Sequence, residues 1–517
     1  MYLSTSAVFG LLVVGRSVAG YAHNTTNITN TTNTTICDLL SSTLPTTIFW
    51  PESQTYNSTI TSYPFPQLRL HPKCVIRPRS AEDVSKAVTI LAKHPEVKFA
   101  IKGGGHNANV GFNNVEDGVT FDMQSLKAVQ ISQPGVVTAG AGALSQDVYD
   151  VTDKHNISVM VGRVGVVGIA GFLTGGGVSF FSPEQGWAAD AILNMQVVLS
   201  SGAIVNANKT SNSDLFAALK GGQNNFGIVT RFDLRSFPAG PVWGGRITYG
   251  NGTEDALLRG FTQFKDPAKY DPYASGWLTF DYNGARAKLF TPVSIMWYTK
   301  PEQKPGALGN ITNVVPKLAD STVVAPVGEF ARNASMAVKG SAKRTIWATT
   351  TFRISPTILH RIHGLWKELV PKICEQFPGT ASQLTFQAIM PAPKADSPPN
   401  SLGFSSTEAP EKDLVFLQIV FSYPDPSASE GLQSALKDFV GIFDAAAEEE
   451  GVKHRFVYLN FAAAFQDPFA GYGADSLRGL RRVARRYDPQ GVFQKQVGGF
   501  KLFNGTTLSP PRQRRYP

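Results

Sequence analysis

The stretch Ile101-Lys102-Gly103-Gly104-Gly105-His106-Asn107 closes an apolar segment that predicts a β-strand over residues 97–102. Its three consecutive glycines leave backbone N–H groups without side-chain cover, so that several of them can converge on a phosphate. The histidine that follows places a nucleophilic imidazole beside whatever the glycines bind. Taken alone, the pattern is more typical of a plain tight turn with a solvated histidine, so a second observation is needed to favour a ligand site.

A second glycine-rich segment supplies that observation. It reads Gly162-Arg-Val-Gly-Val-Val167-Gly168-Ile-Ala-Gly171-Phe-Leu-Thr174-Gly175-Gly176-Gly177. Such a glycine density costs backbone entropy unless close contacts offset it. A third segment, residues 220–230, places another glycine pair before a strand that begins near Ile228 and Val229. We expect the first two segments to wrap one extended ligand.

The pattern of apolar residues around these segments predicts alternating strands and helices. Ser80 is expected to cap a helix whose apolar face holds Val84, Ala87, Val88 and Leu91. This alternation favours an α+β nucleotide-binding unit, but the Gly-x-Gly-x-x-Gly signature of a Rossmann fold is missing. Beyond about residue 240, the pattern predicts an antiparallel sheet backed by helices. The expected strands there are 295–298, 345–352, 384–389 and 414–421, and the expected helices are 254–264, 355–373 and 430–450.

The ordered set of motifs resembles the FAD-linked oxidoreductases of the vanillyl-alcohol oxidase superfamily, which have a PCMH-type FAD-binding domain, and within it the berberine bridge enzyme-like branch. The resemblance covers residues 74–237 and resumes over 458–500. It implies an α+β fold, with an FAD-binding domain of two α/β subdomains and a substrate domain built on an antiparallel sheet backed by helices. We expect a signal peptide at 1–19, a glycosylated disordered tract at 20–36, the FAD domain at 37–238, the substrate domain at 239–453, a return to the FAD domain at 454–503 and a tail at 504–517.

The resemblance also implies how FAD is attached. In the branch, the loop written here as KGGGH carries a histidine that is bonded to the flavin 8α-methyl group, which corresponds to His106. Many members add a cysteinyl bond, but Val164 stands at that position here, so a single covalent bond through His106 is implied. The other implied cofactor contacts are Lys102, Gly103, Gly104, Gly105, Asn107, Gly162, Val167, Gly168, Gly171, Thr174, Gly175, Gly176, Ile228 and Val229.

Catalytic candidates come from two segments. The family commonly has Tyr-x-Asn-Tyr near the flavin ring, and here the segment reads Tyr458-Leu-Asn460-Phe461. Because Phe461 replaces the second tyrosine, a tyrosinate base cannot be assumed. Gln418 is polar within an apolar strand and is a third candidate, although a structural glutamine bonded to backbone is an equal alternative. The histidines lack metal-ligand spacing, and no catalytic metal is expected.

The N-terminal sequence predicts entry into the secretory pathway. A short apolar run, residues 8–14, is typical of a cleavable signal peptide, with a buried N-terminal helix as the alternative. Sequons follow at Asn24, Asn27, Asn30, Asn33, Asn57, Asn156, Asn208, Asn251, Asn310, Asn333 and Asn504. We therefore expect a secreted glycoprotein.

Cysteine use agrees with this route. An oxidising compartment favours pairing of Cys37 with Cys74, and the family resemblance implies the same bridge. Three buried thiols are the alternative. We expect Cys374 to be buried and structural.

Composition excludes several other classes. The 517 residues carry a formal net charge of +9, but the basic residues are dispersed apart from 478–486 and the tail, and there is no recognition motif for nucleic acid. Leu477, Leu480 and Val483 indicate that the basic stretch is one solvated face of a helix. No stretch after the N-terminus is apolar for long enough to cross a membrane. Neither nucleic acid nor a membrane is therefore an expected partner. The family resemblance implies a small-molecule substrate and O2, and the sequence leaves the oligomeric state open.

We expect an oxidase that moves hydride from an alcohol-type carbon of a secondary metabolite or carbohydrate to FAD and then passes electrons to O2, releasing H2O2. The choice of O2 rests on Val167, because a small residue at this position is linked to oxygen access in the resembling branch. An oxidative cyclase or dehydrogenase with another acceptor is one alternative. A glycoprotein that binds FAD or sugar without turnover is the other.

Overall fold

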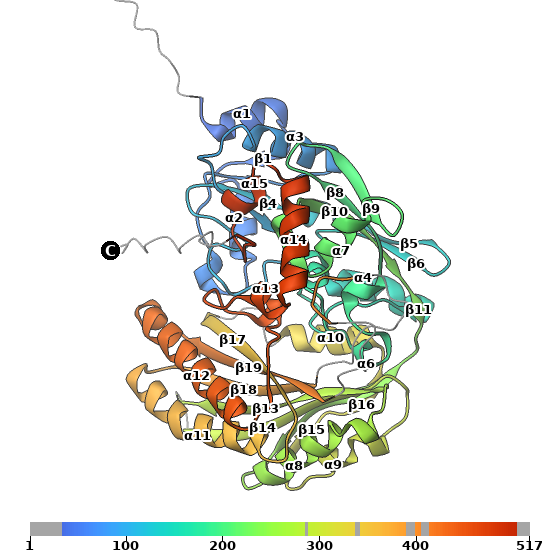
Figure 1. Cartoon of the computed structure of the whole chain (residues 1–517), viewed down its shortest axis with the longest axis vertical. Helices are drawn as coiled ribbons and strands as arrows, with labels where there is room; N and C mark the ends of the chain where they lie inside the picture. Colours follow the sequence, from blue (N-terminus) through green and yellow to red (C-terminus); the bar gives the residue numbers. More distant parts are fainter. Residues whose placement is uncertain (1–33, 285–287, 337–341, 389–398, 405–412, 504–517) are drawn as a thin grey trace, which may run out of the picture. The chain divides into compact units, whose positions relative to one another are not determined.

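The computed structural model describes residues 34–284, 288–336, 342–388, 399–404 and 413–503 (Figure 1). The chain divides into two units, Met1–Thr35 and Ile36–Pro517, and the fold described below belongs to the second. The expected signal peptide, nearly all of the Asn/Thr tract and the tail lie outside the described residues.

The first sheet delivers the KGGGH loop. Its strand order is β1-β2-β4-β3, and β2, β4 and β3 run parallel. As predicted, the Ser80 side chain caps α3 by accepting a hydrogen bond from the backbone N–H of Asp83. The elements are α1 (Ile36–Thr43), β1 (Ile48–Phe49), α2 (Gln54–Thr61), β2 (Cys74–Ile76), α3 (Ala81–Leu91), β3 (Phe99–Lys102) and β4 (Val119–Asp122).

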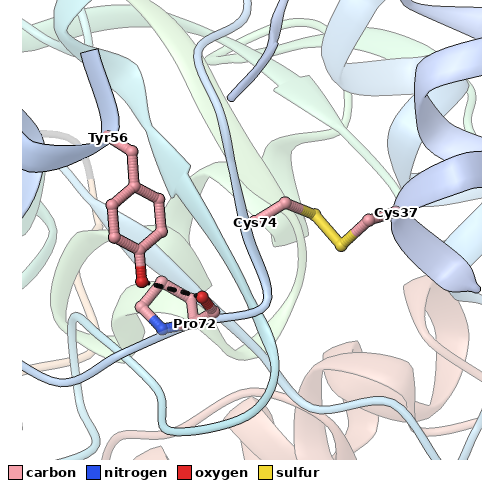
Figure 2. Close-up of a disulfide and its surroundings, with 4 residues drawn as sticks. All are labelled: Cys37, Tyr56, Pro72 and Cys74. Atoms are coloured by element: carbon pink, nitrogen blue, oxygen red, sulfur yellow. Dashed lines mark hydrogen bonds between the residues drawn. A yellow bond between two sulfur atoms is a disulfide. The ribbon is translucent and has the colours of Figure 1, made fainter. Parts of the chain in front are cut away.

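A disulfide joins α1 to the start of β2. Cys37 and Cys74 are both buried, with Cα atoms 6.1 Å apart, and the Tyr56 hydroxyl nearby donates to the Pro72 carbonyl (Figure 2). This confirms the predicted pairing. Cys374 is free and buried, also as expected.

The second sheet is antiparallel, in the order β5-β6-β10-β8-β9. The second glycine-rich segment lies between its strands and includes the short helix α5. The elements are β5 (Val129–Gln133), β6 (Val136–Gly140), α4 (Ser145–Thr152), β7 (Ile157–Ser158), α5 (Ile169–Thr174), α6 (Ser182–Gln185), β8 (Ile192–Val198), β9 (Ile204–Asn208), α7 (Ser213–Gly222), β10 (Ile228–Arg235) and β11 (Phe237–Pro238), which pairs with β7.

The third sheet is the large antiparallel sheet expected from the sequence. Its order is β15-β12-β14-β13-β18-β19-β17-β20, with β16 also paired to β12. One face is covered by α8, α11 and α12, which bury a separate core that includes Trp366 and Phe439 (Figure 1). The elements are β12 (Val242–Tyr249), α8 (Glu254–Phe264), β13 (Ala274–Asn283), β14 (Leu289–Tyr298), α9 (Gly309–Thr312), β15 (Lys317–Asp320), β16 (Val323–Ala325), α10 (Val327–Met336), β17 (Arg344–Arg353), α11 (Ile358–Gln376), β18 (Ala381–Ala388), β19 (Leu414–Tyr423), α12 (Ser429–Glu449) and β20 (Lys453–His454).

The C-terminal segment returns to the first two sheets. The backbone N–H of Phe99 in β3 donates to the Gln496 carbonyl at 2.9 Å, and the Gln496 amide reaches three carbonyls around the end of α3. The basic helix buries Leu480, Val483 and Ala484 and packs beside α7, as Figure 1 shows for the red α14. The elements are α13 (Pro468–Gly471), α14 (Ala474–Tyr487) and α15 (Val492–Lys495).

Two long strands were not predicted. In β12 the pair Gly244 and Gly245 interrupts the apolar pattern, and β13 mixes glycine, threonine and aspartate. Glycine and aspartate have low strand propensity, and pairing on both sides with neighbouring strands overrides it. The helix predicted at 144–155 is also shorter, because it gives way to a 3₁₀ turn that ends at Asn156 in the left-handed region.

Across the described part of the chain, no helix is both long and apolar enough to span a bilayer. No group of three or more His, Cys, Asp or Glu side chains within those residues is arranged to hold a metal ion.

Candidate active site

A cavity of about 740 Å³ lies between the glycine-rich loops and the uncovered face of the large sheet. This volume is within the range of cavities that enclose cofactors and small molecules. One wall consists of residues of the glycine-rich segments, namely 103–107, 162–164, 167–168, 170–171 and 227–229. The opposite wall consists of side chains that alternate along β13, β14, β18 and β19, since residues two apart in a strand share a face. Those side chains are Trp277, Thr279, Ile295, Trp297, Gln383, Thr385, Gln387 and Gln418.

The two glycine loops touch through their backbones. A Cβ atom built on Gly104 would lie 2.3 Å from the Gly168 backbone nitrogen, and one built on Gly168 would lie 2.1 Å from the Gly104 nitrogen. Neither position has room for any side chain. Gly105 adds a left-handed φ of +69° with the Tyr63 ring directly beside it. The glycines are therefore required for the two loops to meet at one end of the cavity.

His106 follows this crossing and lies in the cavity wall. Its Nδ1 atom is buried and has no hydrogen-bond partner among the described residues. The ring centroid lies 5.9 Å from that of Phe65 and 6.1 Å from that of Trp347. Enclosure by protein lowers the pKa of the imidazole to about 4, and the surface it still exposes opens into the cavity. The imidazole is therefore neutral at physiological pH and keeps a nucleophilic lone pair.

Tyr458 and Asn460 meet the second glycine loop from the C-terminal segment. The Asn460 amide donates to the Phe172 carbonyl and to the Tyr458 hydroxyl, both at 3.1 Å. A Cβ on Gly175 would lie 2.1 Å from the Asn460 Oδ1 atom, so Gly175 makes room for this amide. Burial raises the pKa of Tyr458 to about 12, although Asn460 and Arg163 oppose the shift. The phenol is therefore protonated at neutral pH.

Arg163 is a site residue to which the sequence analysis assigned no role. Its side chain is buried and lies in the cavity wall, with the guanidinium 4.5 Å from the Trp277 ring centroid and 5.9 Å from that of Trp297. Its Nη2 donates to the Gln387 Oε1 atom at 2.8 Å. Burial lowers the pKa of Arg163 to about 10, which still leaves it charged at neutral pH. The only signal in the sequence was a lone charge within an apolar, glycine-rich stretch.

A family model described as an FAD binding domain matches residues 72–208. A FAD-dependent monooxygenase of Emericella nidulans, sdcF, is 32% identical over 481 residues, which is 90% of this chain and 98% of the relative. The chain belongs to the FAD-linked oxidoreductases of the vanillyl-alcohol oxidase superfamily. A FAD-dependent monooxygenase of Aspergillus calidoustus, drtC, is 31% identical over 84% of this chain and 83% of its own length. The expected family and the enzyme class, an FAD-dependent oxidoreductase, are thereby confirmed.

Solved structures of the family confirm the fold of this oxidoreductase. The 6-hydroxy-D-nicotine oxidase of Arthrobacter nicotinovorans matches with a TM-score of 0.72 at 18% identity, covering 88% of this chain and 97% of that one. A glucooligosaccharide oxidase of Acremonium strictum matches with a TM-score of 0.72 at 17% identity over 91% of this chain and all of that one, and its FAD is described as 6-S-cysteinyl, 8α-N1-histidyl.

The residues around the cavity fit FAD. The crossing of Gly104 and Gly168 brings side-chain-free backbone to the cavity, where N–H groups can receive a pyrophosphate. Buried polar atoms in folded proteins normally have a bonding partner, and the Nδ1 atom of His106 has none among the described residues. A group bound in the cavity would provide that partner.

Most of the expected cofactor residues line this cavity, and three do not. Lys102 points away from it, because its ammonium pairs with Asp122 at 3.3 Å beneath the Tyr63 ring. Gly176 is covered by Leu402 and Trp187, and Gly175 holds Asn460 as described above. The residues that do line it are Gly103, Gly104, Gly105, His106, Asn107, Gly162, Val167, Gly168, Gly171, Thr174, Ile228 and Val229.

All three catalytic candidates, Tyr458, Asn460 and Gln418, also line the cavity. Gln418 lies opposite Thr349 and Thr385 in neighbouring strands. Its side-chain amide makes no hydrogen bond to any described residue. This differs from the structural alternative, in which a buried glutamine would be bonded to backbone.

Proposed function

We propose that this FAD-dependent oxidoreductase is a secreted oxidase. It would remove hydride from an alcohol-type carbon of a small molecule, a secondary metabolite or a carbohydrate, and pass the electrons to O2 to give H2O2. The observation that carries the proposal is the neutral imidazole of His106, with a free Nδ1, at the point where the two glycine loops cross. The small-molecule substrate is consistent with the oligosaccharide oxidases of the same fold.

We further propose that His106 forms the single covalent bond to FAD. Val164 lines the cavity at the position where relatives with a second tether have cysteine, and its side chain cannot form such a bond. A covalent bond would keep the cofactor from dissociating in a dilute extracellular medium. Residues 37–238 and 454–503 would bind FAD, and residues 239–453 would bind the substrate.

When bound, FAD accepts hydride from a substrate C–H bond. The chain's own residues would hold the pyrophosphate on backbone N–H groups of the glycine loops and exclude water from the space in front of the large sheet. Among the described residues, the cavity wall contains no Asp or Glu, and the Tyr458 phenol is protonated. Tyr458, Asn460 and Gln418 would therefore orient the substrate hydroxyl through hydrogen bonds instead of acting as ionised bases.

O2 is proposed as the electron acceptor because Val167 lines the cavity beside the glycine loop. The names of the curated relatives favour a second candidate, a monooxygenase that would place an oxygen atom in its product. A cyclase or dehydrogenase with another acceptor would consume no O2 at all.

Secretion is supported by two features of the folded chain, one buried and one at the surface. The Cys37–Cys74 disulfide is typical of an oxidising compartment. The sequon asparagines Asn57, Asn156, Asn251, Asn310 and Asn333 are exposed, so the folded chain could carry glycans there.

The decisive experiment combines peptide mass spectrometry with oxygen accounting. We expect flavin mass on the peptide that contains His106, and yellow colour that stays with acid-precipitated protein. Turnover of a panel of sugars and aromatic alcohols should release one H2O2 per O2 consumed. Incorporation of label from ¹⁸O2 into the product would instead establish the monooxygenase, and turnover without O2 uptake would establish a different acceptor.

A further inference from the structure

Arg163 occupies an unusual electrostatic position in the cavity. Arg163 is 8% exposed, and its guanidinium lies over two tryptophan rings and donates one hydrogen bond to a neutral amide, Gln387. Among the described residues it has no carboxylate partner. The phenolate forms of Tyr458 and Tyr149 would raise the pKa of Arg163 by charge attraction. Burial raises the pKa values of both tyrosines, so both phenols are protonated and uncharged at neutral pH. A buried cation is therefore left without an opposite charge.

The rest of the cavity wall supplies no compensating charge. No Asp or Glu of the described residues lines it, and the other arginine there, Arg246, already pairs with Asp281 at 3.5 Å. Burying an unpaired cation is costly, and contact with aromatic rings offsets only part of that cost. A group that enters the cavity with negative charge would complete the pairing.

The direction of Arg163 distinguishes the two ligands that could supply this charge. The pyrophosphate belongs with the crossed glycine backbones, whereas Arg163 lies against β13, β14 and β18, through Trp277, Trp297 and Gln387. These three side chains belong to the wall that faces the glycine loops. Contact with the Trp277 ring and the hydrogen bond to Gln387 hold the guanidinium in place, which suits recognition of an anion through its other N–H groups.

We propose that Arg163 binds an anionic oxygen group of the substrate, a carboxylate or an ionised phenol or enol, carried by a planar ring that packs among the tryptophans. This inference rests on the proposed function, because it assigns the substrate class of the same cavity. It makes acidic aromatic molecules better substrates than neutral sugars. Arg163 then acts as a specificity residue, and Gln387 holds its guanidinium in place.

The test uses the purified flavin-loaded protein and two matched pairs of probes. Benzoate is compared with benzamide, and pentafluorophenolate with the neutral pentafluoroanisole, by titration of the flavin absorption spectrum. In wild type, at least one anion should bind about tenfold more tightly than its neutral partner, since charge-assisted bonds are stronger than neutral ones. Preference for benzoate alone would assign a carboxylate, and preference for pentafluorophenolate alone would assign an acidic phenol or enol. Equal binding within both pairs would overturn the proposal, whatever the variants do.

Variants locate the effect. Arg163→Met should remove the anion preference, and Arg163→Lys should restore part of it. Arg246→Met is the matched control: it removes the same charge from the same cavity, but from a side chain that is half exposed and already paired, so the preference should change less than about threefold. An anion preference that survives Arg163→Met in folded protein would refute the assignment. If Arg163→Met shifts the flavin reduction potential but leaves the preference for anionic probes unchanged, Arg163 acts on the cofactor instead of on the substrate.

The readouts keep the two proposals apart. Acid-stable colour and H2O2 release report on flavin attachment and on the oxidase reaction, whereas the anion preference reports on Arg163. A protein that lacks H2O2 release but retains the preference would contradict the proposed reaction and support the role of Arg163.

Discussion

Gly104 and Gly168 lie backbone against backbone, although they are 64 positions apart in the chain. A Cβ atom on either glycine would approach the backbone nitrogen of the other to within 2.3 Å. The contact joins the loop that carries His106 to the loop that carries Val164 and Val167. Both segments line the cavity, so a bound molecule would contact both of them. Their backbones lie too close together at Gly104 and Gly168 for either residue to carry a side chain.

Gly104→Ala should lower the stability of the folded protein by about 3 kcal/mol or more, because the new methyl group would meet the Gly168 backbone, which cannot yield as a flexible side chain would. It should also lower the bound flavin per chain. Thermal unfolding and flavin absorbance measure both effects. The control is Gly441→Ala on the exposed face of α12, where an added Cβ meets nothing within 4 Å, so that helix propensity should leave stability unchanged or slightly raised. Equal effects of the two substitutions would contradict the crossing.

His106→Ala should release flavin into the supernatant on acid precipitation and leave the fold largely intact, because the imidazole makes no hydrogen bond through Nδ1 that the fold requires. Circular dichroism would verify folding, and absorbance of pellet and supernatant would locate the flavin. Asn107→Ala, one residue further along the same loop, serves as control and should keep the colour in the pellet. Colour that remains with the His106→Ala pellet would mean that the attachment site is elsewhere.

Tyr458→Phe should lower kcat/KM by about tenfold to a hundredfold, because it removes the hydrogen bond that we propose between Tyr458 and the substrate while keeping the ring that stacks on Phe416 with centroids 4.7 Å apart. Since burial raises the pKa of Tyr458 to about 12, its ionisation should contribute no step to the pH profile around neutrality. Initial rates over pH for both proteins test this. A wild-type basic limb that disappears in the variant would show that Tyr458 does work as an ionising base.

The folded protein should lose stability in mild acid, because the buried side chain of His363 resists protonation. Its side chain is buried against Phe280, and burial first, then Lys367, lowers its pKa from 6.5 to about 4. Above pH 6.5 the folded and unfolded chains both hold it neutral, so it has no effect there. As pH falls from 6.5 towards 4, the unfolded chain takes up a proton that the folded chain refuses, and stability drops.

At about pH 5 this costs about 2 kcal/mol. Urea unfolding at neutral and mildly acidic pH should show that His363→Leu flattens the decline by that amount. His360→Leu is a suitable control, because His360 lies at the surface beside Asp255. An equally steep decline after His363→Leu would assign the acid sensitivity to other groups.

Local patterns predicted much of the fold, because they depend on residues close together in the chain. The capped helix after Ser80, the long helices α11 and α12 and strands β17, β18 and β19 all follow from apolar periodicity. Strands β12 and β13 could not be recognised in the same way. Their glycines and polar residues are held in place by neighbouring strands, which are distant in sequence.

The ordered motifs of the amino-acid sequence indicated the family and, through the family resemblance, the FAD cofactor and the loops expected to wrap it, since each motif lies within one short segment of the chain. Only the tertiary structure decided which side chains share the cavity. It turned Lys102 away to pair with Asp122, buried Arg163 against Trp277, and held Tyr458 protonated. Burial and charge pairing arise from segments far apart in the chain, and no local pattern specifies them.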